Sequence, residues 1–133
     1  MRVGEPEFAS RMARDLPPRS EPHTVQDVLD AVGTLHPAIE IPDSRFSDFV
    51  SAGAHRPVIV LRGQQYIGHG KNVLGDPLKA LAWLANELRK LGVTLKAGQI
   101  VTTGTCHPPL PIQSGDLFAA DFGSLGKVSV AFS

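Results

Sequence analysis

The sequence predicts an α+β protein in which short strands outnumber two helices. Thirteen glycines and eleven prolines divide the 133 residues into many short segments, without a repeat or a low-complexity tract. Two stretches show the helical spacing of apolar residues, whereas most of the remaining apolar segments are short enough for strands. The expected order is strand, helix, strand, hairpin, helix and three strands. This mixture favours a single α+β domain over residues 1–133.

The N-terminal half is expected to contain a short helix between two strands. The strands are predicted at residues 7–13 and 38–41. Thr24 is suited to begin the helix because an acidic residue, Asp27, follows three positions later. Valine and leucine then recur at helical spacing, which predicts a helix that ends near Gly33.

The C-terminal half contains the better-specified helix. Asp76 can cap it, Pro77 suits its first turn, and Gly92 provides a stop after a stripe of leucines. Strands are predicted at 58–61 and 65–67, as a hairpin, and at 100–103, 117–122 and 127–132.

Composition and charge argue against several classes of function. Lysine plus arginine and aspartate plus glutamate number 13 each, which leaves no electrostatic case for binding nucleic acid or an anionic membrane. Cys106 is the only cysteine, so an intrachain disulfide is excluded. No apolar run approaches the roughly 18 residues of a membrane-spanning helix, and the first residues lack the apolar stretch of a signal peptide. We therefore expect a soluble cytoplasmic protein.

Three carboxylates are candidate metal ligands. Glu5 and Glu7 are separated by one residue at the edge of a predicted strand, so their side chains point to one face. Glu40 lies between two isoleucines, where an unpaired charge is costly. Together the three acids offer the oxygen ligands that Mg²⁺ prefers. In the alternative interpretation, the first two acids are solvated and Glu40 pairs with Arg45 or Lys71.

Two glycine-containing turns are weaker candidates for binding an anion. The segment 102–105 ends a predicted strand in a turn whose hydroxyl and amide groups either bind a carboxylate or are satisfied locally. The segment 68–71 would place Lys71 near an anion, although no phosphate-loop pattern follows it. Cys106 and His107 are adjacent and would point to opposite sides of a strand, which argues against a catalytic dyad.

An ordered series of short motifs resembles a known family. In the C-terminal half the motifs are Gly75-Asp76-Pro77-Leu78, Ala82-Trp83-Leu84-Ala85-Asn86, Leu95-Lys96-Ala97-Gly98, Thr103-Gly104-Thr105, Gly115-Asp116 and Leu125-Gly126-Lys127-Val128. Upstream they are Arg14-Asp15-Leu16-Pro17, His36-Pro37-Ala38-Ile39-Glu40-Ile41 and Asp43-Ser44-Arg45. The series is similar to the 2-keto-4-pentenoate hydratases and 4-oxalocrotonate decarboxylases of the fumarylacetoacetate hydrolase superfamily. The resemblance implies the β-rich C-terminal domain of that superfamily.

The resemblance also implies a metal site. The family holds its metal with a Glu-x-Glu pair and a third acid after a Pro-Ala-x-Glu stretch, and these acids fall on Glu5, Glu7 and Glu40. The implied Mg²⁺ or Mn²⁺ would chelate a 2-hydroxy-2,4-dienoate through its 1-carboxylate and 2-oxo group. The ion would then stabilise the enolate, and water would add at the distal carbon. Thr105 would contact the substrate carboxylate, and Lys71 in its glycine turn is a second candidate contact. A homo-oligomer is also implied.

The chain departs from the family in ways that leave three interpretations open. The resemblance implies a long region before Met1 and a further segment near residues 54–55, both expected to be missing here, and Pro6 is expected only at an edge or strand start. The chain is then a metal-dependent hydratase of aromatic catabolism, a 2-oxo-acid decarboxylase, or a non-catalytic shortened homologue that serves assembly. The missing pocket segment favours the third interpretation, and the retained acids favour the first two. No residue is assigned as the general acid or base.

Overall fold

The predicted α+β class is confirmed by a computed structural model that describes residues 3–42, 52–53 and 57–133. In chain order its elements are β1 (Val3–Met12), α1 (Val25–Ala31), β2 (Val32–Glu40), β3 (Ala52–Gly53), β4 (Val58–Leu61), β5 (Gln64–Ile67), β6 (Lys71–Val73), α2 (Pro77–Lys90), β7 (Ile100–Thr105), β8 (Leu110–Pro111), β9 (Leu117–Asp121), the 3-10 helix η1 (Gly123–Leu125) and β10 (Lys127–Ala131).

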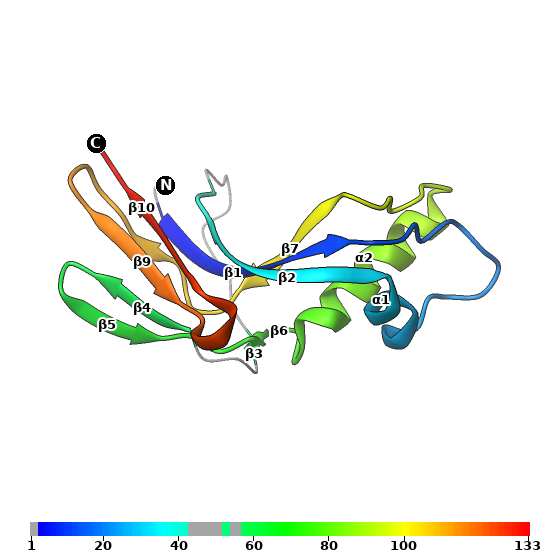
Figure 1. Ribbon diagram of the computed structural model, residues 1–133, viewed down its shortest axis with the longest axis horizontal. Coiled ribbons are helices and arrows are strands. Elements are labelled where there is room, and N and C mark those ends of the chain that lie inside the picture. The colour runs from blue at the N-terminus through cyan, green and yellow to red at the C-terminus, as the bar shows by residue number, and fades with distance from the viewer. Residues whose placement is uncertain (1–2, 43–51, 54–56) are drawn as a thin grey trace.

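The strands form two main sheets that meet at β1. One sheet has the order β2-β1-β7, with β8 also paired to β1, and the other has the order β10-β9-β4-β5. A small third sheet pairs β3 with β6. Both helices lie on the same side of the β2-β1-β7 sheet, and the β4, β5, β9 and β10 strands gather at the other end of the molecule (Figure 1).

Strand β1 is central in its sheet although it contains Pro6. It pairs with β2 on one side, and on the other side with β8 at its start and with β7 from Glu7 onward. The Pro6 carbonyl accepts a hydrogen bond from the Cys106 N–H at 2.7 Å. The nitrogen of the same residue points the same way, toward the gap between β8 and β7, so the missing N–H interrupts no bond with β2. The expectation of an edge position is therefore wrong, and the strand begins at Val3 instead of residue 7.

Helix α1 begins as predicted and ends earlier. The Thr24 hydroxyl accepts a hydrogen bond from the Asp27 N–H at 3.1 Å, and the Asp27 carboxylate accepts one from the Thr24 N–H at 2.7 Å. The helix ends at Ala31, before the predicted end near Gly33, and β2 follows at once. Pairing with the end of β1 draws Val32, a β-branched residue, into the strand. The second strand is therefore much longer than the predicted 38–41.

Helix α2 matches its prediction. The Asp76 side chain accepts a hydrogen bond from the amide two residues later at 2.8 Å, and Pro77 occupies the first turn. Gly92 follows the helix with a φ of +71°, which a glycine adopts without strain. The sequence signals at both ends of this helix are thus sufficient to define it.

The predicted β4–β5 hairpin turns at Arg62 and Gly63. Their φ angles of 51° and 74° fit the two-residue turn that matches the twist of the strands. Arg62 adopts this uncommon conformation while its guanidinium donates to the buried Asp116 carboxylate at 2.8 and 2.5 Å. The C-terminal strands β7, β9 and β10 are also confirmed, whereas the two- and three-residue strands β3, β6 and β8 were not predicted.

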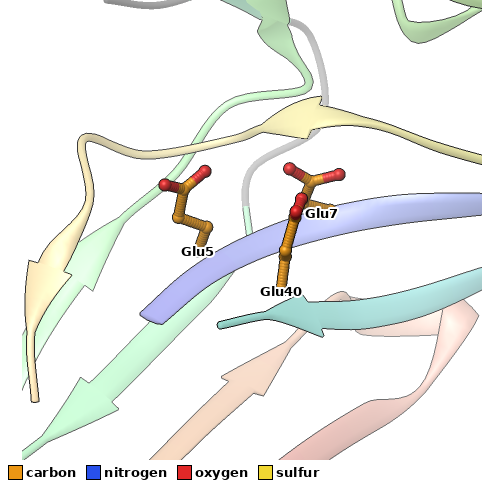
Figure 2. A group of neighbouring side chains, drawn as sticks. All are labelled: Glu5, Glu7 and Glu40. Carbon is orange, nitrogen blue, oxygen red and sulfur yellow. The ribbon is translucent and has the colours of Figure 1, made fainter. Parts of the chain in front are cut away.

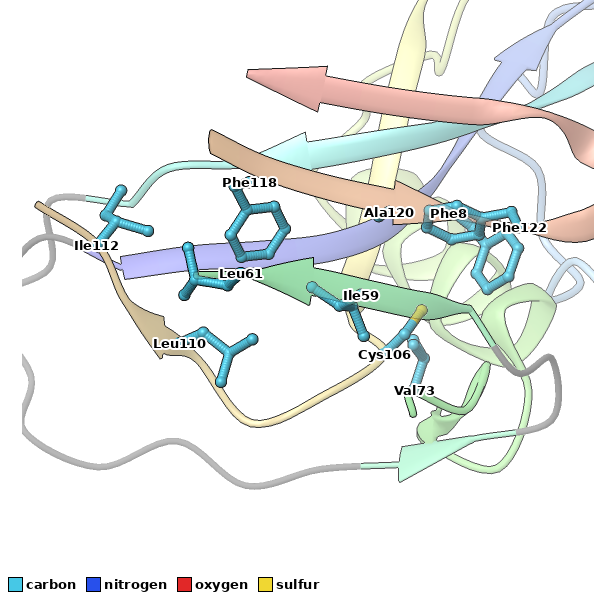
Figure 3. Packing of buried hydrophobic residues seen from close by; sticks show 10 residues of the cluster. All are labelled: Phe8, Ile59, Leu61, Val73, Cys106, Leu110, Ile112, Phe118, Ala120 and Phe122. Carbon is cyan, nitrogen blue, oxygen red and sulfur yellow. The ribbon is translucent and has the colours of Figure 1, made fainter. Parts of the chain in front are cut away.

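Two hydrophobic clusters make up the core. The first packs β1 against β4 and β9 (Figure 3) and contains Phe8, Ile59, Leu61, Val73, Cys106, Leu110, Ile112, Phe118, Ala120 and Phe122. The second lies under the helices and contains Met12, Leu16, Val28, Ala31, Leu81, Ala82, Ala85 and Leu95. Strand β1 contributes Phe8 to the first cluster and Met12 to the second, so it links them.

Some predictions concern residues that the structure does not describe. Arg45 and the proposed join at residues 54–55 lie outside the described residues. No helix among the residues that are described combines the length and the apolar character needed to cross a membrane.

Candidate metal centre

The three predicted acids converge on one face of the β1–β2 pair. Glu5 and Glu7 project from β1 on the same side because one residue separates them. Glu40 is the last residue of β2, and its Cα is the direct partner of Glu5 across the antiparallel pair. Figure 2 shows the side chains gathered beside β1, and a carboxylate oxygen from each lies within 4.8 Å of the others.

Glu7 is the most deeply placed of the three acids. Its side chain is 1% exposed, whereas Glu5 is partly buried and Glu40 is exposed. The Gly104 N–H donates a hydrogen bond to Glu7 Oε2 at 3.0 Å. Of the two interpretations of segment 102–105, the Gly104 backbone does bind a carboxylate, but that carboxylate belongs to the chain itself and is not a ligand. The alternative that Glu7 is a solvated surface residue is wrong.

Burial and the charge of neighbouring carboxylates raise the pKa of both Glu5 and Glu7. Burial is the main reason that the pKa of Glu7 rises to about 8 from an ordinary 4.5; the Gly104 N–H opposes the rise, and Glu40 and then Glu5 add to it. Burial also raises the pKa of Glu5, with the charge of Glu40 as the second cause. The site therefore holds a proton near neutral pH when no cation neutralises it.

No described cation neutralises this cluster. The ion pairs of the described residues join Arg19 to Asp27, Arg62 to Asp116, Lys90 to Glu87 and Lys127 to Asp121. None of these pairs includes Glu5, Glu7 or Glu40, so the predicted pairing of Glu40 with Lys71 does not form. Three carboxylates without a counter-charge among the described residues, one of them buried, fit a hard divalent cation.

The two predicted substrate contacts lie near the same end of β7. Thr105 is the cross-strand partner of Glu7, and its hydroxyl donates to the His107 carbonyl at 2.6 Å. Lys71 is exposed at the start of β6. The turn before it is tied to β7, because the His69 N–H donates to the Cys106 carbonyl at 2.6 Å. Thr105 is thus beside the acids, whereas only the turn that precedes Lys71 is bonded to this part of the chain.

Cys106 is not suited to act as a nucleophile. Its side chain is fully buried, and burial, followed by the charge of Glu7, raises the pKa of the thiol to about 12. The His107 ring packs instead against Tyr66, with centroids 5.6 Å apart. The expectation that these neighbours form no dyad agrees with this arrangement.

Comparison with known proteins supports the predicted resemblance. The sequence is 34% identical over 158 aligned residues to 2-keto-4-pentenoate hydratase 1 of Dechloromonas aromatica (strain RCB), covering 97% of this chain and 59% of that protein. It is 29% identical to 2-oxo-hept-4-ene-1,7-dioate hydratase of Escherichia coli, covering 96% of this chain and 60% of that protein. The chain therefore spans about three fifths of the length of these relatives. No protein-family profile matches it.

The fold is that of the fumarylacetoacetate hydrolase superfamily. 4-Oxalocrotonate decarboxylase from Pseudomonas putida G7, complexed with magnesium and adipate, has a TM-score of 0.85 and 25% identity, covering 99% of this chain and 60% of that one. A fumarylacetoacetate hydrolase family protein from Yersinia pestis CO92 has a TM-score of 0.69 at 17% identity, covering 99% of this chain and 74% of that one, and supports the fold alone. Within this fold, the sequence is similar to the 2-keto-4-pentenoate hydratases and related hydratases.

Proposed function

We propose that this chain is a metal-dependent hydratase that adds water to 2-hydroxy-2,4-dienoates, such as 2-hydroxypenta-2,4-dienoate, to give 4-hydroxy-2-oxo acids. The observation that carries the proposal is the convergence of Glu5, Glu7 and Glu40 within 4.8 Å, without a described counter-charge. The similarity to named hydratases over 97% of the chain supports the reaction class. The proposed ion is Mg²⁺ or Mn²⁺, which suits a site made only of carboxylate oxygens.

Each acid has a distinct part in the proposal. When bound, the ion supplies a Lewis acid that polarises the 2-oxo acid and stabilises the charge of its enolate form. Glu7 Oε2 is fixed by the Gly104 N–H and gives up its proton to become a ligand. Glu40 is exposed, so it keeps the open side of the site accessible to a small anion. Glu5 completes the set beside Glu40.

Two further residues bind the substrate in this proposal. Thr105 contacts the substrate carboxylate, and its hydroxyl leaves the His107 carbonyl to do so. Lys71 carries a positive charge that forms no ion pair with a described residue and so is available to an anion. Thr105 is the last residue of β7, the strand that also fixes Glu7, and the turn before Lys71 is bonded to the residue that follows this strand.

Two alternatives have specific support. The TM-score of 0.85 with 4-oxalocrotonate decarboxylase favours a 2-oxo-acid decarboxylase that uses the same metal site. The alignment with the hydratase relative spans 158 positions, although this chain has 133 residues, so part of the relative has no counterpart inside this chain. This internal difference supports the third interpretation, a shortened homologue without a complete substrate pocket.

The decisive experiment follows the loss of 2-hydroxypenta-2,4-dienoate absorbance with Mg²⁺ and with a chelator. Glu40→Ala is compared with Glu21→Ala, which removes an exposed glutamate from a loop. We expect turnover that needs Mg²⁺, is lost in Glu40→Ala and is unchanged in Glu21→Ala. Turnover that survives both chelation and Glu40→Ala contradicts the metal mechanism. Release of CO₂ from 4-oxalocrotonate instead identifies the decarboxylase, and Mg²⁺ binding without turnover of either compound identifies the shortened homologue.

A further inference from the structure

A pocket on the helix side of the β2-β1-β7 sheet is separate from Glu5, Glu7 and Glu40. It has a volume of about 220 Å³ and lies between β1, β2, α1 and the start of α2. Both helices lie on this side of the sheet (Figure 1). Phe8 and Ser10 line the pocket and alternate with Glu7 along β1, so they point away from the face that carries the acids. We call it the α2-start pocket, and its apolar lining includes Phe8, Leu29, Val32, Leu35 and Leu78.

Ser10 contributes a buried hydroxyl that has no partner among the described residues. Ser10 is 2% exposed, and none of the hydrogen bonds among the described residues involves its side chain. Buried hydroxyls in proteins are usually paired, because losing their contact with water is costly. The Ser10 hydroxyl can both donate and accept, so it can bond a polar group of a molecule in the α2-start pocket.

Asp76 gives the pocket a negative charge. Its Oδ1 accepts the Leu78 N–H at 2.8 Å, and its carboxylate forms no ion pair with a described residue, including Lys79 in the same turn. The first amides of α2 are not available to an anion. Pro77 has no N–H, and the Lys79 N–H donates to the Asp76 carbonyl at 2.9 Å. The α2-start pocket thus offers acceptor oxygens and a negative charge, which suit a cationic ligand.

We propose that the α2-start pocket binds a small primary amine that carries one apolar ring. The ammonium group donates to the Asp76 carboxylate and the Ser10 hydroxyl, and the ring packs among the leucines that line the pocket. An apolar cavity of about 150 Å³ is large enough for benzene, so a volume of about 220 Å³ accommodates a ring with a short side chain. This binding uses neither the acids nor a metal ion, and it is independent of the proposed hydratase reaction.

The test compares three compounds of similar shape on the full chain. Phenethylamine, 2-phenylethanol and phenylacetate each carry one ring and a short chain, which ends in an ammonium, a hydroxyl or a carboxylate group. We expect phenethylamine to bind with a dissociation constant of about 1 mM, 2-phenylethanol to bind about tenfold more weakly, and phenylacetate not to bind measurably. An NMR titration of the methyl groups locates the site, because the signals of Leu29, Leu35 and Leu78 should shift as phenethylamine is added.

Two variants of the pocket test its polar contacts. Asp76→Asn removes the charge but keeps a side chain that caps a helix, so the variant should fold. It is expected to weaken the binding of phenethylamine by about tenfold and to leave 2-phenylethanol nearly unchanged. Ser10→Ala removes only the hydroxyl and is expected to weaken phenethylamine by about threefold or more. Circular dichroism checks that both variants are folded.

Two further variants show whether the amine binds elsewhere. Asp30→Asn removes an exposed charge next to Leu29, and Glu40→Gln removes one from the candidate metal centre; both are expected to leave the affinity for phenethylamine unchanged. A loss of binding in Glu40→Gln but not in Asp76→Asn assigns the amine to the acids and overturns the proposal.

Three other results also overturn it. The first is that wild-type protein binds none of the three compounds at about 10 mM, which includes the case in which the chain itself fills the pocket. The second is that 2-phenylethanol or phenylacetate binds as tightly as phenethylamine. The third is that the affinity for phenethylamine is unchanged in a folded Asp76→Asn or Ser10→Ala variant.

Discussion

Replacing Glu7 with glutamine isolates the energetic effect of a buried acid. The folded state raises the pKa of Glu7 to about 8 from an ordinary 4.5, chiefly by burial. The folded protein thus holds this proton more tightly than the unfolded chain does. The associated stability is complete below about pH 4.5 and is lost as the pH rises to about 8. At about 1.4 kcal/mol per unit of pKa, the loss between pH 5 and pH 8 is about 3–4 kcal/mol.

The assay is chemical denaturation of wild type and Glu7→Gln in chelator at several values between pH 5 and pH 8. Glutamine keeps the shape of the side chain and an oxygen that accepts the Gly104 N–H, so the variant should fold. We expect its unfolding free energy to depend less on pH than that of wild type, by about 3–4 kcal/mol over this range. Contributions from titrating groups that do not interact with Glu7 cancel in the difference, whereas Glu5 and Glu40 contribute to it because they raise the pKa of Glu7. Parallel pH curves for the two proteins would refute the burial argument.

Four other outcomes follow from the structure. Mg²⁺ should bind about tenfold more tightly per pH unit between pH 6 and pH 8, with release of one proton from Glu7, as calorimetry in buffers of different ionisation enthalpy would show; a pH-independent affinity would contradict this coupling. Gly4→Ala should lower the unfolding free energy by about 1–3 kcal/mol, because an added Cβ would lie 2.6 Å from the Phe118 ring. Phe118→Leu should relieve part of that cost in a double-mutant cycle, and additive effects would count against the clash. Asp76→Ala should cost about 1 kcal/mol in denaturation and Asp76→Asn much less, since asparagine also caps helices. Cys106 should react with a thiol reagent at pH 8 only as fast as the protein opens, because burial raises its pKa to about 12; fast reaction of the native protein would disagree.

Sequence motifs were sufficient to predict those helix ends that depend only on residues close together in the chain. Asp76, Pro77 and Gly92 define α2, and Thr24 with Asp27 defines the start of α1. These features depend on contacts within a few residues, so they can be read without knowing the rest of the fold.

Features set by distant contacts were harder to predict. Val32 continues a helical pattern in the sequence, yet pairing with β1 makes it the first residue of β2. Pro6 lies inside a central strand because β1 changes partner from β8 to β7 at that point. The spacing of Glu5 and Glu7 predicted a shared face. The burial of Glu7 and its bond to Gly104 depend on β7, about 97 residues later in the chain, and no local pattern encodes them.

The burial of β1 limits how the proposed metal site can change during evolution. Apart from Glu5 and Arg11, every residue of this strand is buried, and the strand is shared by both hydrophobic clusters. A substitution near Glu5 or Glu7 therefore disturbs the packing of the whole protein. Glu40 is exposed at the end of its strand, where a new side chain has room. If the proposed site holds an ion and a substrate, divergence toward a different ligand is thus expected to begin at position 40, while the two acids of β1 persist as part of the scaffold.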